Sequence, residues 1–211
     1  MGNDMVARMQ GRTELPLFPV GNVLFSGGRL PLQIFEPRYV DMISACTKSN
    51  TGFGVVLIRH GNEVRVDKDE EAPSVFDIGT YASIVDFNPL PNGRLGIISE
   101  GGAKFRVCST WEKDDRLLMG EVEFLPEERA VSIGEQFEPL VEILRRLAED
   151  PIIQRLGLEI DFTDARSVSW RLSELLPVDP ETKQSLLQMQ MPRERLSEIK
   201  RLVAKLQGSA R

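Results

Sequence analysis

The chain has 211 residues, of which 41% are hydrophobic and 27% are charged, so it falls in the ordinary globular class and suits one large or two small domains. Its net charge of −6 argues against nucleic-acid binding, because phosphate contacts need a basic surface. No apolar run approaches the roughly 18 residues of a membrane helix, and residues 1–12 lack the apolar stretch of a signal peptide. With only Cys46 and Cys108, we expect a cytoplasmic protein with two buried thiols rather than a disulfide framework.

The first 125 residues predict short β-strands. Residues 52–58 (GFGVVLI) form a nearly continuous apolar run, which is typical of a strand buried on both faces. Residues 80–87 and 95–98 flank an Asn-Gly pair at 92–93, the strongest short signal for a β-hairpin. Apolar and acidic residues alternate over 118–124, which predicts a strand with one wet face. Regular short strands of this kind indicate a small barrel or a closed sheet.

Two further features of this half involve prolines. Pro16 and Pro19 interrupt the apolar runs near the start, so those runs are expected to be separate short segments. Pro37 fits the first turn of a helix, where its missing N–H costs nothing. The apolar residues that follow at helical spacing are Tyr39, Met42, Ile43 and Cys46. One helix is therefore predicted inside the β-rich half.

After Pro126 the apolar period becomes helical. Four helices are predicted, with stripes that include Phe137, Leu140, Val141, Leu144 and Leu147, then Val168, Leu172, Leu175 and Leu176, then Leu186 and Leu187, and last Leu196, Ile199, Val203 and Leu206. Asp179-Pro180 reads as an N-cap followed by proline at the first helical position. The basic residues of the last helix, Arg195 among them, are expected on a solvated face. The predicted organisation is a disordered N-terminus (1–12), a β domain (13–126) and a helical domain (132–207).

The sequence contains none of the compact motifs that carry chemistry. There is no Gly-Lys pair for a phosphate-binding Walker loop and no Gly-x-Ser-x-Gly nucleophile elbow. Cys46, His60 and Cys108 are not spaced in the close pairs of a zinc site. A Ser–Lys dyad has no obligatory spacing and stays open. We therefore expect no metal, no cofactor and no intrinsic catalysis.

Several ordered motifs resemble the N-terminal, substrate-binding domain of Lon proteases. Residues 14–25 (ELPLFPVGNVLF) and 30–39 (LPLQIFEPRY) resemble the opening of that domain, and the Phe-Glu-Pro-Arg-Tyr string is the most specific part. Further similar stretches follow in the family's order at 53–58, 77–82, 90–94 and 175–184. The resemblance covers about residues 13–205, which is nearly the whole chain.

The resemblance implies an α+β fold, with a PUA-like β barrel that carries one inserted helix and is followed by a C-terminal α-helical bundle. In Lon proteases this region recognises unfolded or tagged polypeptides, and ATPase and Ser–Lys protease modules follow it. This chain stops where those modules would begin, so we expect a bacterial-type, non-catalytic polypeptide-binding or adaptor protein related to proteolysis. The alternatives are an RNA-binding PUA-like module and an accessory subunit that docks on a protease or another machine.

The family-signature residues are the candidates for polypeptide binding: Leu17, Phe18, Phe35, Glu36, Arg38 and Tyr39. Each also has a structural interpretation. The apolar ones can belong to the core, Glu36 can cap the helix at Pro37, and Arg38 can pair with an acid. The expected partners are unfolded or tagged polypeptides or a protein partner, without nucleic acid or membrane, and weak self-association stays open.

Overall fold

The computed structural model describes residues 11–64, 70–90 and 95–209. The chain divides into two compact units, Met1–Pro126 and Glu127–Arg211, called here the first and second units. The first unit holds a mostly antiparallel sheet with one helix and the second unit holds helices, so the predicted α+β class is confirmed. Of the predicted disordered N-terminus, residues 1–10 lie outside the described residues, and Arg12 already belongs to a strand.

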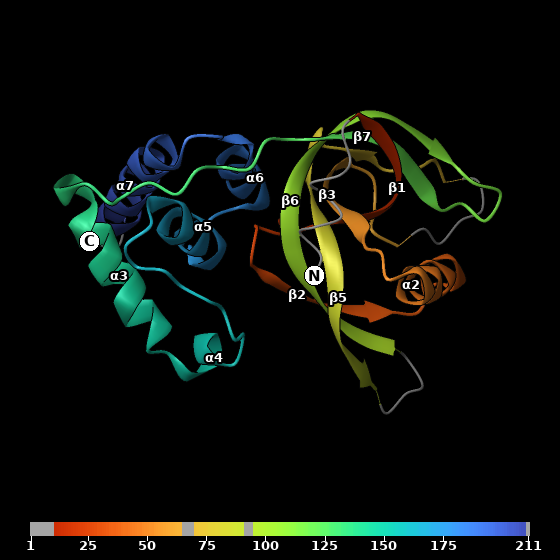
Figure 1. Cartoon of the computed structure of the whole chain (residues 1–211), viewed down its shortest axis with the longest axis horizontal. Coiled ribbons are helices and arrows are strands. Elements are labelled where there is room, and N and C mark those ends of the chain that lie inside the picture. The colour runs from red at the N-terminus through yellow and green to blue at the C-terminus, as the bar shows by residue number, and fades with distance from the viewer. Residues whose placement is uncertain (1–10, 65–69, 91–94, 210–211) are drawn as a thin grey trace. The chain divides into compact units, whose positions relative to one another are not determined.

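The sheet of the first unit closes on itself by pairing (Figure 1). Its elements are β1 (Arg12–Val20), β2 (Arg29–Ile34), α2 (Pro37–Ser49), β3 (Phe53–His60), β4 (Ser74–Val75), β5 (Ile78–Pro89), β6 (Leu95–Glu112) and β7 (Leu118–Phe124). The strand order is β1-β7-β6-β5-β3-β4, and β2 pairs with β6. β1 also pairs in parallel with β3, which completes a cycle of five strands: β1, β7, β6, β5 and β3. The predicted β5–β6 hairpin pairing is confirmed up to Pro89 opposite Leu95, while its turn at 91–94 lies outside the described residues.

β1 is continuous through Pro16 and Pro19, so the prediction of separate short segments is wrong here. Residues 12–16 of β1 pair with β7, and residues 17–20 pair with β3. Each half of the strand therefore has a partner along one edge only. A proline is tolerated in a strand when its missing N–H faces an unpaired edge.

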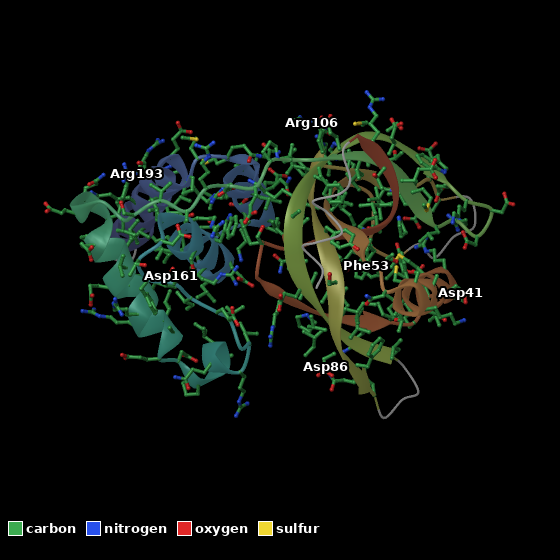
Figure 2. All side chains as sticks on the ribbon, viewed as in Figure 1. Asp41, Phe53, Asp86, Arg106, Asp161 and Arg193 are labelled. Carbon is green, nitrogen blue, oxygen red and sulfur yellow. The ribbon has the colours of Figure 1, made fainter. Side chains whose placement is uncertain are left out.

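Two apolar clusters lie on opposite faces of the sheet. The first is formed by β-strand residues together with the predicted stripe of α2, and includes Phe18, Ile34, Tyr39, Met42, Ile43, Cys46, Phe53 and Val55. The second includes Leu17, Val56, Tyr81, Phe105, Leu118 and Val122. Phe53 points into the first unit, whereas Asp41 of α2 and Asp86 of β5 are exposed (Figure 2). The predicted apolar stripe of α2 is therefore buried against strand residues of the sheet.

The second unit contains the four predicted helices. Its elements are η1 (Glu135–Phe137), α3 (Glu138–Ala148), α4 (Pro151–Gln154), α5 (Ala165–Leu175), α6 (Pro180–Gln188) and α7 (Pro192–Ser209). The short 3-10 helix η1 and the short α4 were not predicted as separate elements. The fully buried side chains include Leu144, Val168, Leu172, Leu186, Leu196 and Ile199. Within the described part of the chain, no helix is both long and apolar enough to cross a membrane.

Two expectations about single residues are wrong. Cys108 is exposed, because the β6–β7 register shifts between Val107 and Ser109 and a thiol at that irregularity has no fixed place in the core. Arg195 is not on a solvated face of α7 but is fully buried. Its guanidinium makes a bidentate pair with Glu128 and also donates to the Leu186 carbonyl and the Ser169 hydroxyl, both at 3.0 Å.

Candidate functional site

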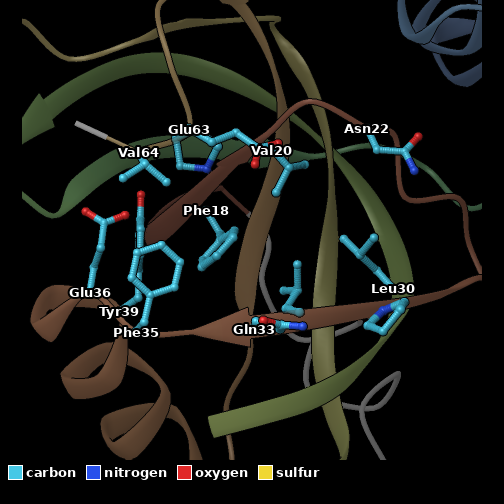
Figure 3. Close-up of a pocket in the computed structure, with 13 residues that line it drawn as sticks. Phe18, Val20, Asn22, Leu30, Gln33, Phe35, Glu36, Tyr39, Glu63 and Val64 are labelled. Atoms are coloured by element: carbon cyan, nitrogen blue, oxygen red, sulfur yellow. The ribbon is translucent and has the colours of Figure 1, made fainter. Parts of the chain in front are cut away.

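A pocket of about 340 Å³ opens on the first unit between β1, β2, the start of α2 and the loop after β3 (Figure 3). Its lining consists of Phe18, Pro19, Val20, Asn22, Leu30, Pro31, Leu32, Gln33, Phe35, Glu36, Tyr39, Glu63 and Val64. In the view of Figure 3, Phe35 and Tyr39 lie at one end, Leu30 lies at the other, and Phe18 and Val20 lie between them. The lining is mainly apolar with a few polar groups, as in most ligand pockets.

The backbone of β1 decides which of its side chains reach the pocket. Phe18 and Leu17 are neighbours, and successive side chains of a strand point to opposite faces. Phe18 lines the pocket, whereas Leu17 is 0% exposed and belongs to the apolar cluster on the other face, beside Val56 and Phe105. Leu17 is therefore a core residue, separated from the pocket by the sheet.

β2 contributes an edge of the pocket. Four consecutive residues, 30–33, line it, although their side chains alternate between the two faces of the strand. Among the described residues, β2 pairs with β6 alone, so it has a partner along one edge. Because consecutive residues of β2 line the pocket, the pocket lies beside an extended backbone.

Three aromatic side chains gather where β2 passes into α2. The rings of Phe18 and Tyr39 lie 4.3 Å apart between centroids, and both side chains are at least nine-tenths buried. Phe35 is 46% exposed, although it follows the buried Ile34 at the end of β2. Pro37 starts the helix directly afterwards, so the chain turns at Phe35 and leaves its ring at the mouth of the pocket.

Glu36 and Arg38 form an ion pair next to these rings. The Nη2 of Arg38 donates to Oε2 of Glu36 at 2.6 Å, and its Nη1 donates to the carbonyl of Arg116 at 2.9 Å. The guanidinium also lies over the ring of Tyr39, 4.6 Å from its centroid. Arg38 thus pairs with an acid, as expected. Glu36 occupies the N-cap position of α2 but makes no capping bond with its side chain, because its carboxylate turns to Arg38 instead.

The remaining polar group of the mouth comes from the loop after β3. The backbone N–H of Gly21 donates to Oε1 of Glu63, which ties this loop to the end of β1. Asn22 accepts from its neighbour Val23 at 2.8 Å and so shapes the same turn. In Figure 3, Glu63 and Val64 lie on one side of the pocket and Gln33 lies on the opposite side.

The structure brings four of the six predicted residues to the pocket, namely Phe18, Phe35, Glu36 and Tyr39. Leu17 and Arg38 do not line it. Sequence reasoning missed Leu30 and Leu32, although their alternation in β2 was a usable signal. It also missed Glu63 and Val64, and no local pattern could have found them, because only the tertiary fold brings that loop to β1.

The side chains that line the pocket are mostly apolar, with few titratable groups among them. Its described lining contains no serine, cysteine, histidine or lysine, and its titratable side chains are Glu36, Tyr39 and Glu63. Two titratable groups lie in the adjacent core: burial raises the pKa of the Cys46 thiol and of the Tyr81 phenol, which keeps both neutral. Across the described residues, no group of three acids, cysteines or histidines could hold a metal ion.

Comparison with protein families identifies a match over most of the chain. Residues 14–205 match the model of the ATP-dependent protease La (LON) substrate-binding domain. Among curated proteins, a Lon protease from Anaeromyxobacter dehalogenans is 27% identical over 139 residues, which are 65% of this chain and 16% of that protein. A Lon protease from Brevibacillus choshinensis is 22% identical over 196 residues, 88% of this chain and 24% of that protein. The chain therefore spans a quarter or less of the length of these relatives.

Solved structures point the same way. A Lon N-terminal domain protein from Xanthomonas campestris is 30% identical and superposes with a TM-score of 0.71, covering 89% of this chain and 96% of that one. The N-terminal domain of a Mycobacterium avium complex Lon protease, 15% identical with a TM-score of 0.56 and the same coverage, shares the fold.

Proposed function

The chain belongs to the family of Lon substrate-binding domains, and from this premise we propose that its first unit binds extended polypeptide segments in the pocket beside β2. The observation that carries the proposal is the exposed Phe35 at the mouth of an apolar pocket. A large aromatic side chain held at a pocket rim gains free energy when a second apolar group covers it. Unfolded polypeptides offer such groups, whereas folded proteins bury most of theirs.

The geometry supports anchoring by side chains more than strand addition. An extended segment can lie along β2, because the four consecutive residues 30–33 all contribute to the lining of the pocket. Pro31 in the middle of that strand has no N–H to donate, which weakens any backbone ladder at this edge. The proposed contact is therefore one large apolar side chain in the pocket, with the flanking backbone resting on β2. Such binding tolerates many sequences.

We also propose the details of the fold and of the role that the sequence resemblance implies. The cycle of five paired strands supports a PUA-like barrel, and the buried apolar faces of α3, α5, α6 and α7 support a helical bundle. We propose a non-catalytic, adaptor-like role in the cytoplasm, since the pocket offers a holding surface without reactive groups. RNA is the weaker ligand, because the described lining includes Glu36 and Glu63 but neither lysine nor arginine.

The test compares two exposed phenylalanines. Phe35→Ser should weaken binding of a reduced, alkylated and permanently unfolded protein by about fivefold or more, the loss typical of an anchor residue. Phe87→Ser is the matched control, because Phe87 is 44% exposed, close to the 46% of Phe35, but does not line the pocket. Fluorescence anisotropy with a labelled client gives both dissociation constants.

An equal loss of affinity in the two variants would show that any exposed aromatic residue contributes to binding. That result would reject the pocket as the binding site. Binding of single-stranded RNA, but of no unfolded protein, would reject the proposal as a whole. The two ligands also differ in salt response. The affinity for single-stranded RNA should fall steeply between 50 and 200 mM salt, by about 300-fold or more if six or more phosphates are contacted, while apolar anchoring should change little.

A further inference from the structure

The mouth of the pocket carries negative charge. Glu36 and Glu63 are the only charged residues in its described lining. They approach from different elements, Glu36 from the N-cap of α2 and Glu63 from the loop after β3. An apolar pocket with carboxylates at its rim discriminates between ligands of opposite charge, because a nearby cation is attracted and a nearby anion is repelled.

The two carboxylates are not equivalent. The charge of Glu36 is offset by Arg38, whose side chain is only 8% exposed and whose guanidinium is held by Glu36 and the Arg116 carbonyl. The partial positive charge at the N-terminus of α2 is also met by Glu36. Glu63 is exposed, and among the described residues it forms no ion pair and accepts one hydrogen bond, from the uncharged backbone N–H of Gly21. Within the described lining, Glu63 is therefore the carboxylate whose negative charge is not offset by a cation.

We propose that this pocket selects polypeptide segments in which the apolar anchor stands next to lysine or arginine, and that it disfavours segments with aspartate or glutamate there. This inference rests on the proposed function, since it assigns a preference to the same pocket. The anchor would occupy the space between Phe18, Phe35 and Leu30, and the neighbouring cation would lie at the rim near Glu63. An exposed ion pair of this kind changes affinity by roughly two- to fivefold.

Three labelled peptides test the preference with the intact chain. Each has a central Leu-Phe pair in a glycine–serine frame, flanked by two lysines, two serines or two glutamates. The lysine peptide should bind best and the glutamate peptide worst, with the serine peptide between them. In Glu63→Gln the amide oxygen can still accept from Gly21, so the fold is retained, and the spread among the three peptides should shrink by about two- to fivefold.

A matched variant separates the effect of the charge at Glu63 on peptide affinity from the effect of the protein's net charge of −6. Glu14→Gln removes one exposed carboxylate of β1 that does not line the pocket, so it should leave the order and spread of the peptides unchanged. Raising the salt concentration to 1 M, where the Debye length is about 3 Å, should narrow the spread in the parent protein.

The possible outcomes distinguish a failure of the charge preference from a failure of polypeptide binding itself. Equal affinity for all three peptides, or an equal effect of Glu14→Gln and Glu63→Gln, would overturn the charge preference while leaving apolar binding intact. No binding of any of the three peptides would overturn the proposed function and the inference with it.

Discussion

Arg195 lies wholly inside the second unit, where its guanidinium links three segments. It pairs with Glu128 from the start of the unit and donates to the hydroxyl of Ser169 in α5. It also donates to two carbonyls at the end of α6, that of Leu186 in the last turn and that of Met189 at the C-cap. The ring of Trp170 lies near the same guanidinium, 5.8 Å from its carbon to the ring centroid. A buried charge of this kind is tolerated because all its partners are supplied.

Arg195→Met should therefore lower the free energy of unfolding of the second unit by about 3–5 kcal/mol, because it leaves the Glu128 carboxylate buried without a counter-charge. Arg201→Met is the control, since the Arg201 side chain is 70% exposed in its pair with Glu198 and should change stability by less than about 0.5 kcal/mol. Urea denaturation followed by circular dichroism measures both. Similar stabilities for the two variants would contradict the role given to Arg195.

The positions of single residues also decide which candidate residues reach the pocket. Leu17 and Phe18 are both apolar and adjacent, and nothing in their local sequence ranks one above the other. The alternation of β1 sends them to opposite faces, and the pairing with β3 decides which face is which. Phe35 could be identified as a signature residue, but its exposure depends on where β2 ends and α2 begins.

Among the elements, α6 shows how a local signal fixes a helix end. Asp179 lies at the N-cap, and its carboxylate accepts from the backbone N–H of Thr182 at 2.8 Å and from the Thr182 hydroxyl at 2.7 Å. These bonds to the ionised form lower the pKa of Asp179. The Asp-Pro pair was sufficient to predict this helix start, because both residues act within one turn of the chain.

This capping predicts a pH dependence. Since the pKa is lower in the folded state than the unfolded value of about 3.9, the contribution of Asp179 to stability is fully present above that value. It is lost as the pH falls through the folded pKa. Asp179→Asn keeps an acceptor but does not titrate, so its urea midpoint should fall less between pH 6 and pH 3 than that of the parent. Identical acid dependence in the two proteins would contradict this account.

β6 shows the opposite case, an element that is longer in the fold than its local pattern indicates. The apolar run at 95–98 predicted a short strand, whereas β6 continues from Leu95 to Glu112. The strand passes through Gly101, where an added Cβ would clash with the carbonyl oxygen of Phe25. Only glycine permits that approach, so a residue that locally weakens a strand is required here by a neighbouring loop.

At the scale of the whole molecule, the division at Glu127 has an experimental consequence. A fragment of residues 127–209 contains both Glu128 and Arg195, whereas one that starts at residue 132, the predicted domain start, leaves Arg195 buried without its acid. We expect the longer fragment to fold and the shorter one to be markedly less stable. Helix content and urea midpoints measure the difference, and equal stability would show that residues 127–131 are a dispensable linker.

The sequence by itself determined the features that depend on neighbours within a turn or a strand. The starts of α2 and α6, the buried strand β3, the β5–β6 pairing and the change from β to helical period all follow from spacing and from proline placement. The family could also be identified from ordered short motifs, and the match over residues 14–205 confirms it.

Only the tertiary structure decided the pocket, the buried pair of Arg195 with Glu128, and the continuity of β1 and β6. Each of these depends on contacts between residues far apart in the chain: Glu63 reaches Gly21, Glu128 reaches Arg195, and Phe25 meets Gly101. The local sequence pattern does not show which distant residues will meet, because these contacts are stabilised by packing and charge pairing that exist only in the folded chain. The pocket is therefore a property of the fold, although Phe35, Glu36 and Tyr39 at one end of it come from the family's most specific motif.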